Sequence, residues 1–368
     1  MIKKLNKIFK IIQVIPRPDG GGAEKLVREL CLSLHKNNFD VTTIYFYNPS
    51  KIKLNKNEYC LNLLGPRDIR AVWYLRKMIS NFAKKKKIII HSHLTWPLYF
   101  LTIATYNIKT IDFYTEHNDY NYRRKFFFLK YIERLIYSRC YKIICNSNGT
   151  KNSLIRWLKN KHINQKIIVI LNGARLFKIV KRKKINPKRL KLVSIGSLNK
   201  KKGFDVAIKA IAQVKNDIHK YTIIGEGSQK KKLLNLSRKL NIENKVFLTG
   251  YIKNIEPHLS NMDIGLIPSR WEGFGLVSVE MLSTGMPLIC SNVPGLSEVV
   301  NKCLAVELVK SNNSVAITKG ILKLIKKIKN QDTNVIVEHA RKRAEKFDIQ
   351  LFCDNYKNLY LDAISKFN

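Results

Sequence analysis

The sequence predicts an α/β protein with two Rossmann-like domains, each built on a parallel sheet, that face each other across a cleft. Two observations predict this fold. Short apolar strands alternate with amphipathic helices along both halves of the chain, which is typical of parallel sheets with right-handed crossovers. In addition, 368 residues are more than one hydrophobic core commonly organises, and a hydrophobic fraction of 45% is enough to fill two.

The first half is expected to contain a series of strands, because its apolar runs are rich in β-branched and aromatic residues. These runs are residues 9–15, 41–47, 88–90, 110–115, 141–145 and 167–171. Between the first two, apolar residues recur at helical spacing over residues 23–34. Each strand ends in a polar or glycine-rich cluster, and ligand sites of open parallel sheets lie at the carboxyl ends of the strands.

A charged stretch, residues 178–189, separates the two halves because it contains Pro187 and almost no apolar periodicity. We therefore expect a first domain over residues 1–180, a linker over 181–189 and a second domain over 190–347. Strands of the second domain are predicted at residues 192–195, 221–224, 246–248, 264–267 and 288–290. Residues 335–367 are expected to be helical, with an interruption near Asp348.

Lysine and arginine outnumber aspartate and glutamate by 68 to 26, which gives a formal net charge of +42. Three explanations are open: a compositional bias of the kind that an AT-rich genome produces, attraction to the anionic cytoplasmic face of a membrane, and binding of nucleic acid. Lys, Asn and Ile are abundant throughout the chain, which favours the first. No nucleic-acid recognition module is present, so we expect no nucleic-acid partner.

The seven cysteines are scattered and form no Cys-x-x-Cys pair, so neither a disulfide framework nor a zinc site is predicted. The most apolar stretch, residues 94–108, is too short to span a bilayer. We expect a soluble cytoplasmic protein, without metal ligands or a tightly bound cofactor, that attaches peripherally to the inner face of the plasma membrane.

Glycines follow a strand at two places. Residues 20–22 are three glycines that open a helix, where free backbone amides favour a phosphate group, although a tight strand-to-helix turn explains them equally well. In the second half, Gly196 and Ser197 follow a strand, and Lys202 precedes the next helix. A lysine at this place is suited to neutralise a diphosphate, but a solvated lysine is the simpler explanation in so lysine-rich a chain.

The strongest local feature is the segment 268–280, in which Glu272 and Glu280 bracket the sequence Gly-Phe-Gly. We expect a helix to begin near Phe274, with Glu280 about two turns, or roughly 10 Å, further along. Amides at the helix start favour a diphosphate, and acidic side chains suit the vicinal hydroxyls of ribose or a sugar. The alternative is a pair of ordinary helix acids.

Three histidines lie at strand ends of the first half. His117 is expected either to hydrogen-bond a sugar hydroxyl near the reacting centre or to be structural, whereas His91 and His93 are expected to be structural. The segment 120–141 is basic and aromatic. It is suited to lie on an anionic bilayer surface, or to dock on the first sheet with its Phe and Leu side chains inward, and both can hold together.

These residues resemble glycosyltransferase family 4, a group of bacterial sugar transferases with the GT-B fold. The most specific part is the Glu-x7-Glu pattern from Glu272 to Glu280, and the resemblance covers nearly the whole chain. The other matching pieces follow in family order: Gly21 to Glu24, Thr115 to His117, Asn172-Gly173, Lys202-Gly203, residues 225–227 and residues 247–250.

The resemblance implies a retaining, metal-independent hexosyltransferase that moves a sugar from a UDP- or GDP-sugar to a lipid-linked or polysaccharide acceptor, in surface polysaccharide, O-antigen or capsule biosynthesis. The first domain would take the acceptor and the second the nucleotide-sugar, with the final helix, 348–368, crossing back to the first. His117 and Glu272 are the implied catalytic residues. The implied donor-binding residues are Gly21, Gly22, Ser197, Lys202, Tyr251, Ile252, Glu272, Gly273, Phe274, Gly275, Leu276 and Glu280.

Within that set, Glu280 would hold the ribose, Glu272 and the amides around Phe274 the donor sugar, and Lys202 the diphosphate. Ser197 departs from the pattern, because the family often has an arginine there; Lys200, Lys201 and Arg270 are candidate substitutes. Two other functions stay open. One is an isomerase of the nucleotide-sugar epimerase type, which shares the GT-B fold but lacks the Glu-x7-Glu pattern, and the other is a non-catalytic basic protein that binds membranes or nucleic acid.

Overall fold

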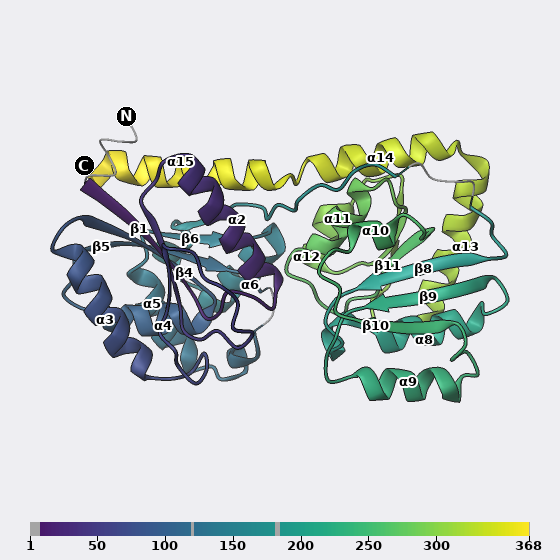
Figure 1. Ribbon diagram of the computed structural model, residues 1–368, viewed down its shortest axis with the longest axis horizontal. Coiled ribbons are helices and arrows are strands. Elements are labelled where there is room, and N and C mark those ends of the chain that lie inside the picture. Colours follow the sequence, from purple (N-terminus) through teal and green to yellow (C-terminus); the bar gives the residue numbers. More distant parts are fainter. Residues whose placement is uncertain (1–7, 119–120, 181–184, 368) are drawn as a thin grey trace. The chain divides into compact units, whose positions relative to one another are not determined.

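The computed structural model describes residues 8–118, 121–180 and 185–367. The chain forms two compact units: unit 1 comprises residues 1–173 and 349–368, and unit 2 comprises residues 174–348. Each unit is a parallel sheet covered by helices (Figure 1). This confirms the two Rossmann-like sheets that the alternation of strands and helices predicts.

The sheet of unit 1 has seven parallel strands in the order β3-β2-β1-β4-β5-β6-β7. They are β1 (Phe9–Ile15), β2 (Val41–Tyr45), β3 (Glu58–Cys60), β4 (Lys87–His93), β5 (Thr110–Glu116), β6 (Lys142–Cys145) and β7 (Ile167–Val169). The helices are α2 (Gly22–Lys36), α3 (Arg70–Ala83), α4 (Thr95–Ala104), α5 (Leu129–Ser138), α6 (Asn148–Leu158), α7 (Lys161–Asn164) and the C-terminal α15 (Ile349–Phe367), with a 3-10 turn at Tyr122–Lys125.

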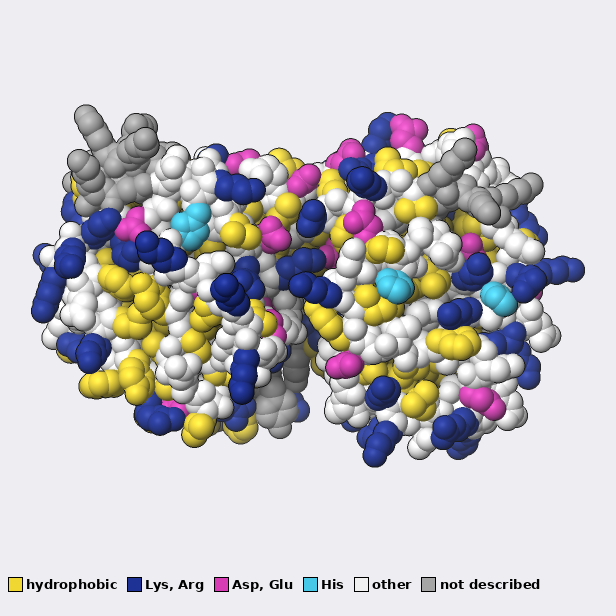
Figure 2. Space-filling model, in the orientation of Figure 1, with side chains coloured by type: hydrophobic (Ala, Val, Ile, Leu, Met, Phe, Trp, Pro, Cys, Tyr) yellow, Lys and Arg dark blue, Asp and Glu magenta, His cyan; other side chains and the backbone are white. Residues whose placement is uncertain are grey.

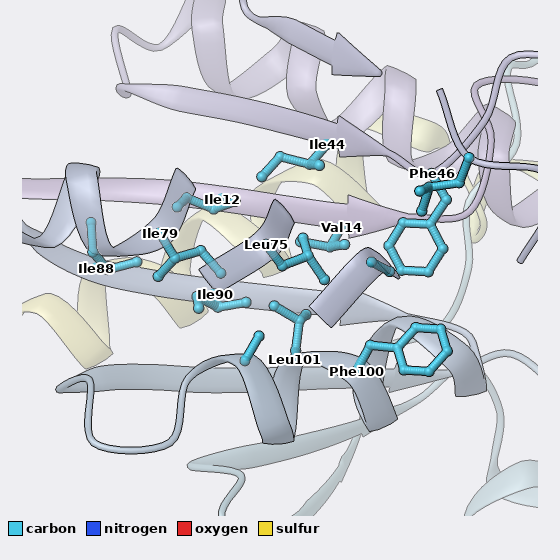
Figure 3. Close-up of a cluster of buried hydrophobic side chains, with 13 residues drawn as sticks. Ile12, Val14, Ile44, Phe46, Leu75, Ile79, Ile88, Ile90, Phe100 and Leu101 are labelled. Carbon is cyan, nitrogen blue, oxygen red and sulfur yellow. The ribbon is translucent and has the colours of Figure 1, made fainter. Parts of the chain in front are cut away.

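Alternation along β1 divides its side chains between the two faces of this sheet. On one face, apolar side chains of the central strands pack against α3 and α4 (Figure 3). The labelled members of this cluster are Ile12, Val14, Ile44, Phe46, Leu75, Ile79, Ile88, Ile90, Phe100 and Leu101. Gln13 therefore lies on the opposite face, where its side chain meets Tyr360 of α15.

The sheet of unit 2 has six parallel strands in the order β10-β9-β8-β11-β12-β13. They are β8 (Leu190–Ile195), β9 (Ile218–Ile224), β10 (Val246–Gly250), β11 (Ile264–Ile267), β12 (Leu288–Ser291) and β13 (Val306–Val309). The helices are α8 (Phe204–Gln213), α9 (Lys230–Lys239), α10 (Glu256–Leu259), α11 (Leu276–Ser283), α12 (Pro294–Val300), α13 (Ser314–Asn330) and α14 (Thr333–Glu345), with a 3-10 turn at Lys200–Lys202.

The strand order reverses direction once in each sheet, between β1 and β4 in unit 1 and between β8 and β11 in unit 2. At such a switch point the loops that follow the two neighbouring strands diverge to opposite faces, which leaves room for a ligand at the carboxyl edge. The glycines at 20–22 follow β1, His91 and His93 lie at the end of β4, Lys202 follows β8 and Glu272 follows β11. The candidate residues thus gather at the two switch points.

The expected domain bounds differ from the division into units. Residues 174–180 belong to unit 2, because Phe177 N donates to Ser283 Oγ at 2.9 Å and Val180 N donates to the Thr284 carbonyl at 3.2 Å. Part of the expected linker, residues 181–184, lies outside the described residues. The interruption near Asp348 is confirmed, since α14 ends at Glu345 and α15 begins at Ile349.

Candidate functional site

The structure places the predicted site residues in two sets. Unit 2 carries the loops after β8 and β11, with Ser197, Lys202 and the segment 272–280, while unit 1 carries Gly21, Gly22 and His117. The loops of unit 2 form one cluster, because their side chains contact each other directly at the β8/β11 switch point.

Glu272 is the centre of this cluster. Glu272 is 8% exposed, and its carboxylate accepts a hydrogen bond from Lys202 Nζ at 2.7 Å and one from Ser269 Oγ at 3.1 Å. Lys201 Nζ lies 3.8 Å from its other oxygen. Burial acts against ionisation, but the two lysines and the hydrogen bonds from Lys202 and Ser269 outweigh it, so that the pKa of Glu272 lies below its usual value. The acid is therefore a charged group at neutral pH.

Glycines bring the backbone close to this cluster. A Cβ atom on Gly203, which has φ of +67°, would lie 2.1 Å from the Pro268 carbonyl oxygen, so only glycine lets the loops after β8 and β11 touch. At Gly196 a Cβ would lie 3.0 Å from the Lys202 side chain. The absence of a side chain there allows Lys202 to lie across the end of β8 and reach Glu272.

Helix α11 begins at Leu276, two residues later than expected. Gly275 has φ of +89° and is the residue before the helix, and this left-handed conformation keeps Gly273 and Phe274 outside it. Glu280 consequently lies little more than one turn after the helix start, and the expected two-turn spacing is wrong. The Phe274 side chain packs against Phe347, with ring centroids 5.5 Å apart, so this position can offer a ligand only its backbone.

Three further donor-binding candidates lie on the loops after β8 and β10. Ser197 is exposed and accepts a hydrogen bond from Asn199 Nδ2 at 2.9 Å. Tyr251 is 73% exposed and, with the half-buried Ile252, follows β10. The strand before them ends where Gly225 N donates to the Gly250 carbonyl at 2.8 Å.

Replacing Gly295 with alanine is expected to weaken ligand binding at the cluster by about tenfold or more. A Cβ at this position would lie 2.3 Å from the carbonyl oxygens of Glu272 and Gly273, so the loop that carries Glu272 must move, and overpacking of this kind costs about 1–3 kcal/mol. Titration calorimetry with a nucleotide ligand measures the effect. Gly65→Ala is the matched control, because its Cβ would have no atom within 4 Å, and equal affinity in both variants would contradict the prediction.

In unit 1, Gly22 is the first residue of α2, directly after the loop that follows β1, and Gly21 precedes it without a side-chain cap. A Cβ on Gly21 would lie 2.6 Å from Glu24 Oε2. Glu24 is itself buried, and burial raises its pKa. The amides at this helix start are therefore not capped by a side chain of Gly21, and the acid beside them is less readily ionised than usual.

His117 follows β5 and lies beside His93, with 3.2 Å between His93 Nδ1 and His117 Nε2. Asn146 Nδ2 donates to the His117 carbonyl at 3.1 Å. Burial lowers the pKa of His117 to about 4. Burial and the neighbouring histidines lower the pKa values of His91 and His93 well below the usual range. All three rings are therefore neutral at pH 7, and His91 and His93 are buried members of one hydrogen-bonded network.

These histidines make unit 1 sensitive to mild acid. In the unfolded chain they take up protons near pH 6.5, whereas His117 in the fold stays neutral down to about pH 4. The unfolded state then binds more protons, so the free energy of unfolding is highest above pH 6.5 and falls as the pH drops towards 4. For His117 we expect a loss of roughly 2 kcal/mol between pH 7 and pH 5.

Urea unfolding of unit 1 at both pH values measures this loss. The His117→Asn variant is expected to lose less stability on acidification, and the variant of the exposed His162, His162→Gln, is expected to behave like the unaltered chain. A pH dependence that His117→Asn leaves unchanged would contradict the assignment to this histidine.

The basic aromatic segment does not fold as one helix. It begins with a 3-10 turn over Tyr122–Lys125 and continues in α5 from Leu129, while residues 119–120 lie outside the described part. The expectation that its Phe side chains turn inward is wrong, because Phe126, Phe127 and Phe128 are 47%, 75% and 52% exposed. Buried ion pairs fix the segment instead: Glu133 is fully buried and accepts from Arg123, Tyr99 and Trp157.

Several contacts of the site were missed from the sequence. Ser269 and Lys201 contact Glu272, and Gly295 supports its loop. The sequence offered a hint of Ser269 and Lys201, since Ser269 lies in the segment 268–280 and Lys201 is next to Lys202. Gly295 carried none, because only the fold brings it beside residues 272–273.

The described part of the chain holds neither a cluster of metal ligands nor a helix able to cross a membrane. In residues 8–118, 121–180 and 185–367, no three His, Cys, Asp or Glu side chains lie together as ligands for a metal ion. Within the same ranges, none of the helices combines the length and apolar character that a bilayer crossing requires.

Two family models match the chain on either side of the boundary between the units. The model of glycosyltransferase family 4 matches residues 20–176, and that of the glycosyl transferases group 1 matches residues 177–343. The chain belongs to these glycosyltransferases. The identification agrees with the positions of the cluster, since the match of the group 1 model includes Lys202, Glu272 and Glu280.

Relatives of this glycosyltransferase include an uncharacterized glycosyltransferase of Haemophilus influenzae, which is 24% identical over 92% of this chain and 96% of its own. A Campylobacter jejuni transferase of N-acetylgalactosamine to a diphospho-undecaprenol-linked sugar is 31% identical over 44% of each chain. Among solved structures, Anabaena HepE, crystallised with UDP and glucose, superimposes with a TM-score of 0.79 over 96% of this chain and 99% of its own at 17% identity. Sucrose-phosphate synthase of Thermosynechococcus elongatus gives 0.81 over 97% and 100% at 18% identity. These neighbours show that the glycosyltransferase has the GT-B fold.

Proposed function

We propose that this glycosyltransferase moves a sugar, with retention of configuration, from a nucleotide-diphosphate donor to a lipid-linked or glycan acceptor in surface polysaccharide biosynthesis. The observation that carries the proposal is the Lys202–Glu272–Ser269 cluster at the β8/β11 switch point, beside the start of α11. It combines a cation, an ionised acid and free helix amides in one place, which are the groups that a diphosphate and a sugar require.

In this proposal Lys202 binds the diphosphate and Glu280 the ribose, while Glu272 and the backbone from Gly273 to Leu276 bind the donor sugar. The backbone near Tyr251 and Ile252 faces the nucleobase of the same donor. Anabaena HepE, which shares the fold, was crystallised with UDP and glucose, and this supports a UDP-sugar as the first donor to test. No tightly bound cofactor and no metal is part of the proposal.

Lys201 is proposed to supply the second positive charge that Ser197 lacks. Its Nζ lies 3.8 Å from the Glu272 carboxylate, so it is already at the cluster. Arg270 is not suited to this role, because its guanidinium donates to both oxygens of Asp205, at 2.9 and 2.7 Å, and to the Lys200 carbonyl at 2.7 Å.

The chemistry follows from these positions. Departure of the nucleoside diphosphate builds negative charge on the leaving oxygen, which Lys202, Lys201 and the amides before α11 stabilise. His117 is proposed to contact the donor sugar near the reacting carbon. Glu272 already accepts hydrogen bonds from Lys202 and Ser269, so it is suited to bind hydroxyl groups and to orient Lys202 rather than to carry a proton.

The acceptor is proposed to be presented at the inner face of the plasma membrane. The α5 apolar surface, which we define as Phe126, Phe127, Phe128, Tyr131 and Leu135, is exposed on unit 1. Lys130 and Arg134 lie over the Tyr131 ring, both 5.4 Å from its centroid. Apolar side chains flanked by cations suit an anionic bilayer. The relative from Campylobacter jejuni acts on a lipid-linked substrate, which supports such an acceptor.

Vesicle sedimentation tests the attachment. Phe127→Ser and Leu135→Ser are expected to weaken binding to anionic vesicles, whereas Leu322→Ser, an exposed leucine of α13, is not. Basic side chains are spread over the face shown in Figure 2 rather than gathered in one patch. Equal binding by all three variants would contradict it.

A binding panel of UDP-, GDP- and ADP-sugars tests the donor. The unaltered chain is expected to bind one nucleotide class, and Glu280→Ala is expected to bind it about tenfold more weakly or worse, because a buried acid that accepts from ribose hydroxyls is lost. The exposed Glu243→Ala is the matched control. Failure of every sugar nucleotide to bind would overturn the proposed function.

A further inference from the structure

A chain of buried side chains connects His117 to the C-terminal helix of unit 1. Gln13 of β1 stands in its middle and is fully buried. Its amide oxygen lies 2.8 Å from His93 Nε2, and its amide nitrogen donates to the Tyr360 hydroxyl of α15 at 2.8 Å. His93 then contacts His117 at 3.2 Å. Gln13 of β1 and Tyr360 of α15 thereby belong to one hydrogen-bonded network with His117.

The chemistry of the amide fixes the direction of each hydrogen bond towards His117. An amide oxygen only accepts, so His93 Nε2 carries the proton and donates to Gln13. A neutral imidazole has one N–H, so His93 Nδ1 is an acceptor. His117 Nε2 is therefore the donor of the 3.2 Å contact. In neutral His117 the other nitrogen, Nδ1, is left with a lone pair.

The amide nitrogen of Gln13 fixes the hydrogen bonds on the other side of the network, from Tyr360 to His91 and Thr115. Because Gln13 donates to the Tyr360 hydroxyl, that hydroxyl directs its own proton to His91 Nδ1, 2.5 Å away. His91 then donates from Nε2 to Thr115 Oγ1 at 2.7 Å. Every polar group between Gln13 and Thr115 has a partner in this arrangement, so the orientation of one amide determines the tautomers of all three histidines.

Nδ1 of His117 is one end of the network. Among residues 8–118, 121–180 and 185–367, none forms a hydrogen bond with this atom, and the His117 side chain is partly exposed. A lone pair at this place accepts a hydrogen bond and cannot donate one. It suits a hydroxyl group and does not suit a carbonyl, ether or phosphate oxygen.

We propose that Gln13 is a positioning residue that acts through His93 to hold His117 as the neutral Nε2–H tautomer, so that His117 Nδ1 accepts a hydrogen bond from a hydroxyl of the bound sugar. The contact with the sugar rests on the proposed function, whereas the tautomer does not. Selectivity follows: a donor whose contacted hydroxyl is replaced by fluorine or a methyl ether cannot donate to Nδ1 and is bound more weakly.

Nitrogen NMR of the full chain with 15N-labelled histidine tests the tautomer without any ligand. His117 is expected to give the pattern of the neutral Nε2–H form, with His117→Asn used to assign its signals. In Gln13→Leu, which removes the acceptor of His93, His117 is expected to become a mixture of tautomers. In Gln13→Glu, whose carboxylate still accepts from His93 Nε2, the Nε2–H form is expected to persist. A neutral Nδ1–H form in the unaltered chain, or an unchanged tautomer in Gln13→Leu, would overturn the proposal.

Kinetics and donor titration test the contact with the sugar. Gln13→Leu is expected to lower kcat/KM by about tenfold, the effect of one misdirected hydrogen bond, and Gln13→Glu is expected to restore most of it. Addition of a UDP-sugar that calorimetry shows to bind is expected to shift the His117 Nδ1 resonance, and an unmoved resonance would overturn the hydroxyl contact. If no sugar nucleotide binds, the proposed function fails, while the ligand-free spectra still decide the tautomer.

Discussion

Replacing Lys202 with methionine is expected to lower kcat by about 100- to 1,000-fold. Methionine keeps much of the length of the side chain but removes the charge that stabilises the leaving diphosphate, and loss of one such donor has an effect of this size. Removal of the 2.7 Å contact also leaves the buried Glu272 with the Ser269 hydroxyl and the more distant Lys201. Steady-state transfer from a radiolabelled nucleotide-sugar to an extracted lipid-linked acceptor measures the change.

Two further lysine variants are the controls for Lys202→Met. Lys201→Met is expected to cause a smaller loss, because Lys201 Nζ is 3.8 Å from the carboxylate. Lys209→Met, at an exposed position of α8, is expected to retain full activity. If Lys202→Met and Lys209→Met have the same kcat, Lys202 does not stabilise the leaving group.

Replacing Glu133 with alanine is expected to destabilise unit 1 by about 3–5 kcal/mol. Glu133 is fully buried and accepts from Arg123, from Tyr99 at 2.5 Å and from Trp157 at 2.5 Å. Removal of the acid leaves these donors, and the charge of the largely buried Arg123 above all, without their closest acceptor, and breaking a buried pair from one side costs about this much. Urea unfolding followed by tryptophan fluorescence measures the loss.

An exposed pair of the same charges is the control for Glu133. Glu338 and Lys342 are one turn apart on α14 and lie 2.5 Å from each other, with side chains 59% and 69% exposed. Glu338→Ala is expected to leave the unfolding midpoint unchanged, because solvent screens such pairs. Equal shifts in the two variants would show that burial of Glu133 contributes nothing.

The sequence predicts the strands that consist of continuous apolar runs. All of the predicted runs are strands in the structure, with ends that differ by a few residues. The two that were missed, β3 and β13, are both edge strands. Each is short, and each carries a glutamate, Glu58 or Glu307. In so short a strand a charged residue interrupts the apolar run, so the composition gives little signal.

Local spacing predicted part of the site and misplaced another part. The Glu-x7-Glu pattern identified Glu272 and Glu280, but Gly273 and Gly275 suggested a helix that starts earlier than it does. Gly275 has a left-handed φ, and a Cβ at this position would lie 2.8 Å from the Leu296 side chain, a contact that no local pattern reveals.

No local sequence pattern predicts the histidine network. Gln13 and Tyr360 are 347 positions apart in the sequence, and a single glutamine within an apolar strand resembles a tolerated polar residue. Only the pairing of β1 with β4, which places Gln13 opposite His91, and the return of α15 to unit 1 give it partners.

The discontinuity of unit 1 has a consequence for biosynthesis. A ribosome synthesises residues 1–173 well before α15, because residues 174–348 come between them. At about 5–20 residues per second this interval lasts roughly 10 to 35 s. Until then Gln13 and His91 have no Tyr360 to bond, and the face of the sheet that α15 covers is open to water. The nascent chain thus completes unit 2 before unit 1, and α15 closes the core that β1 began.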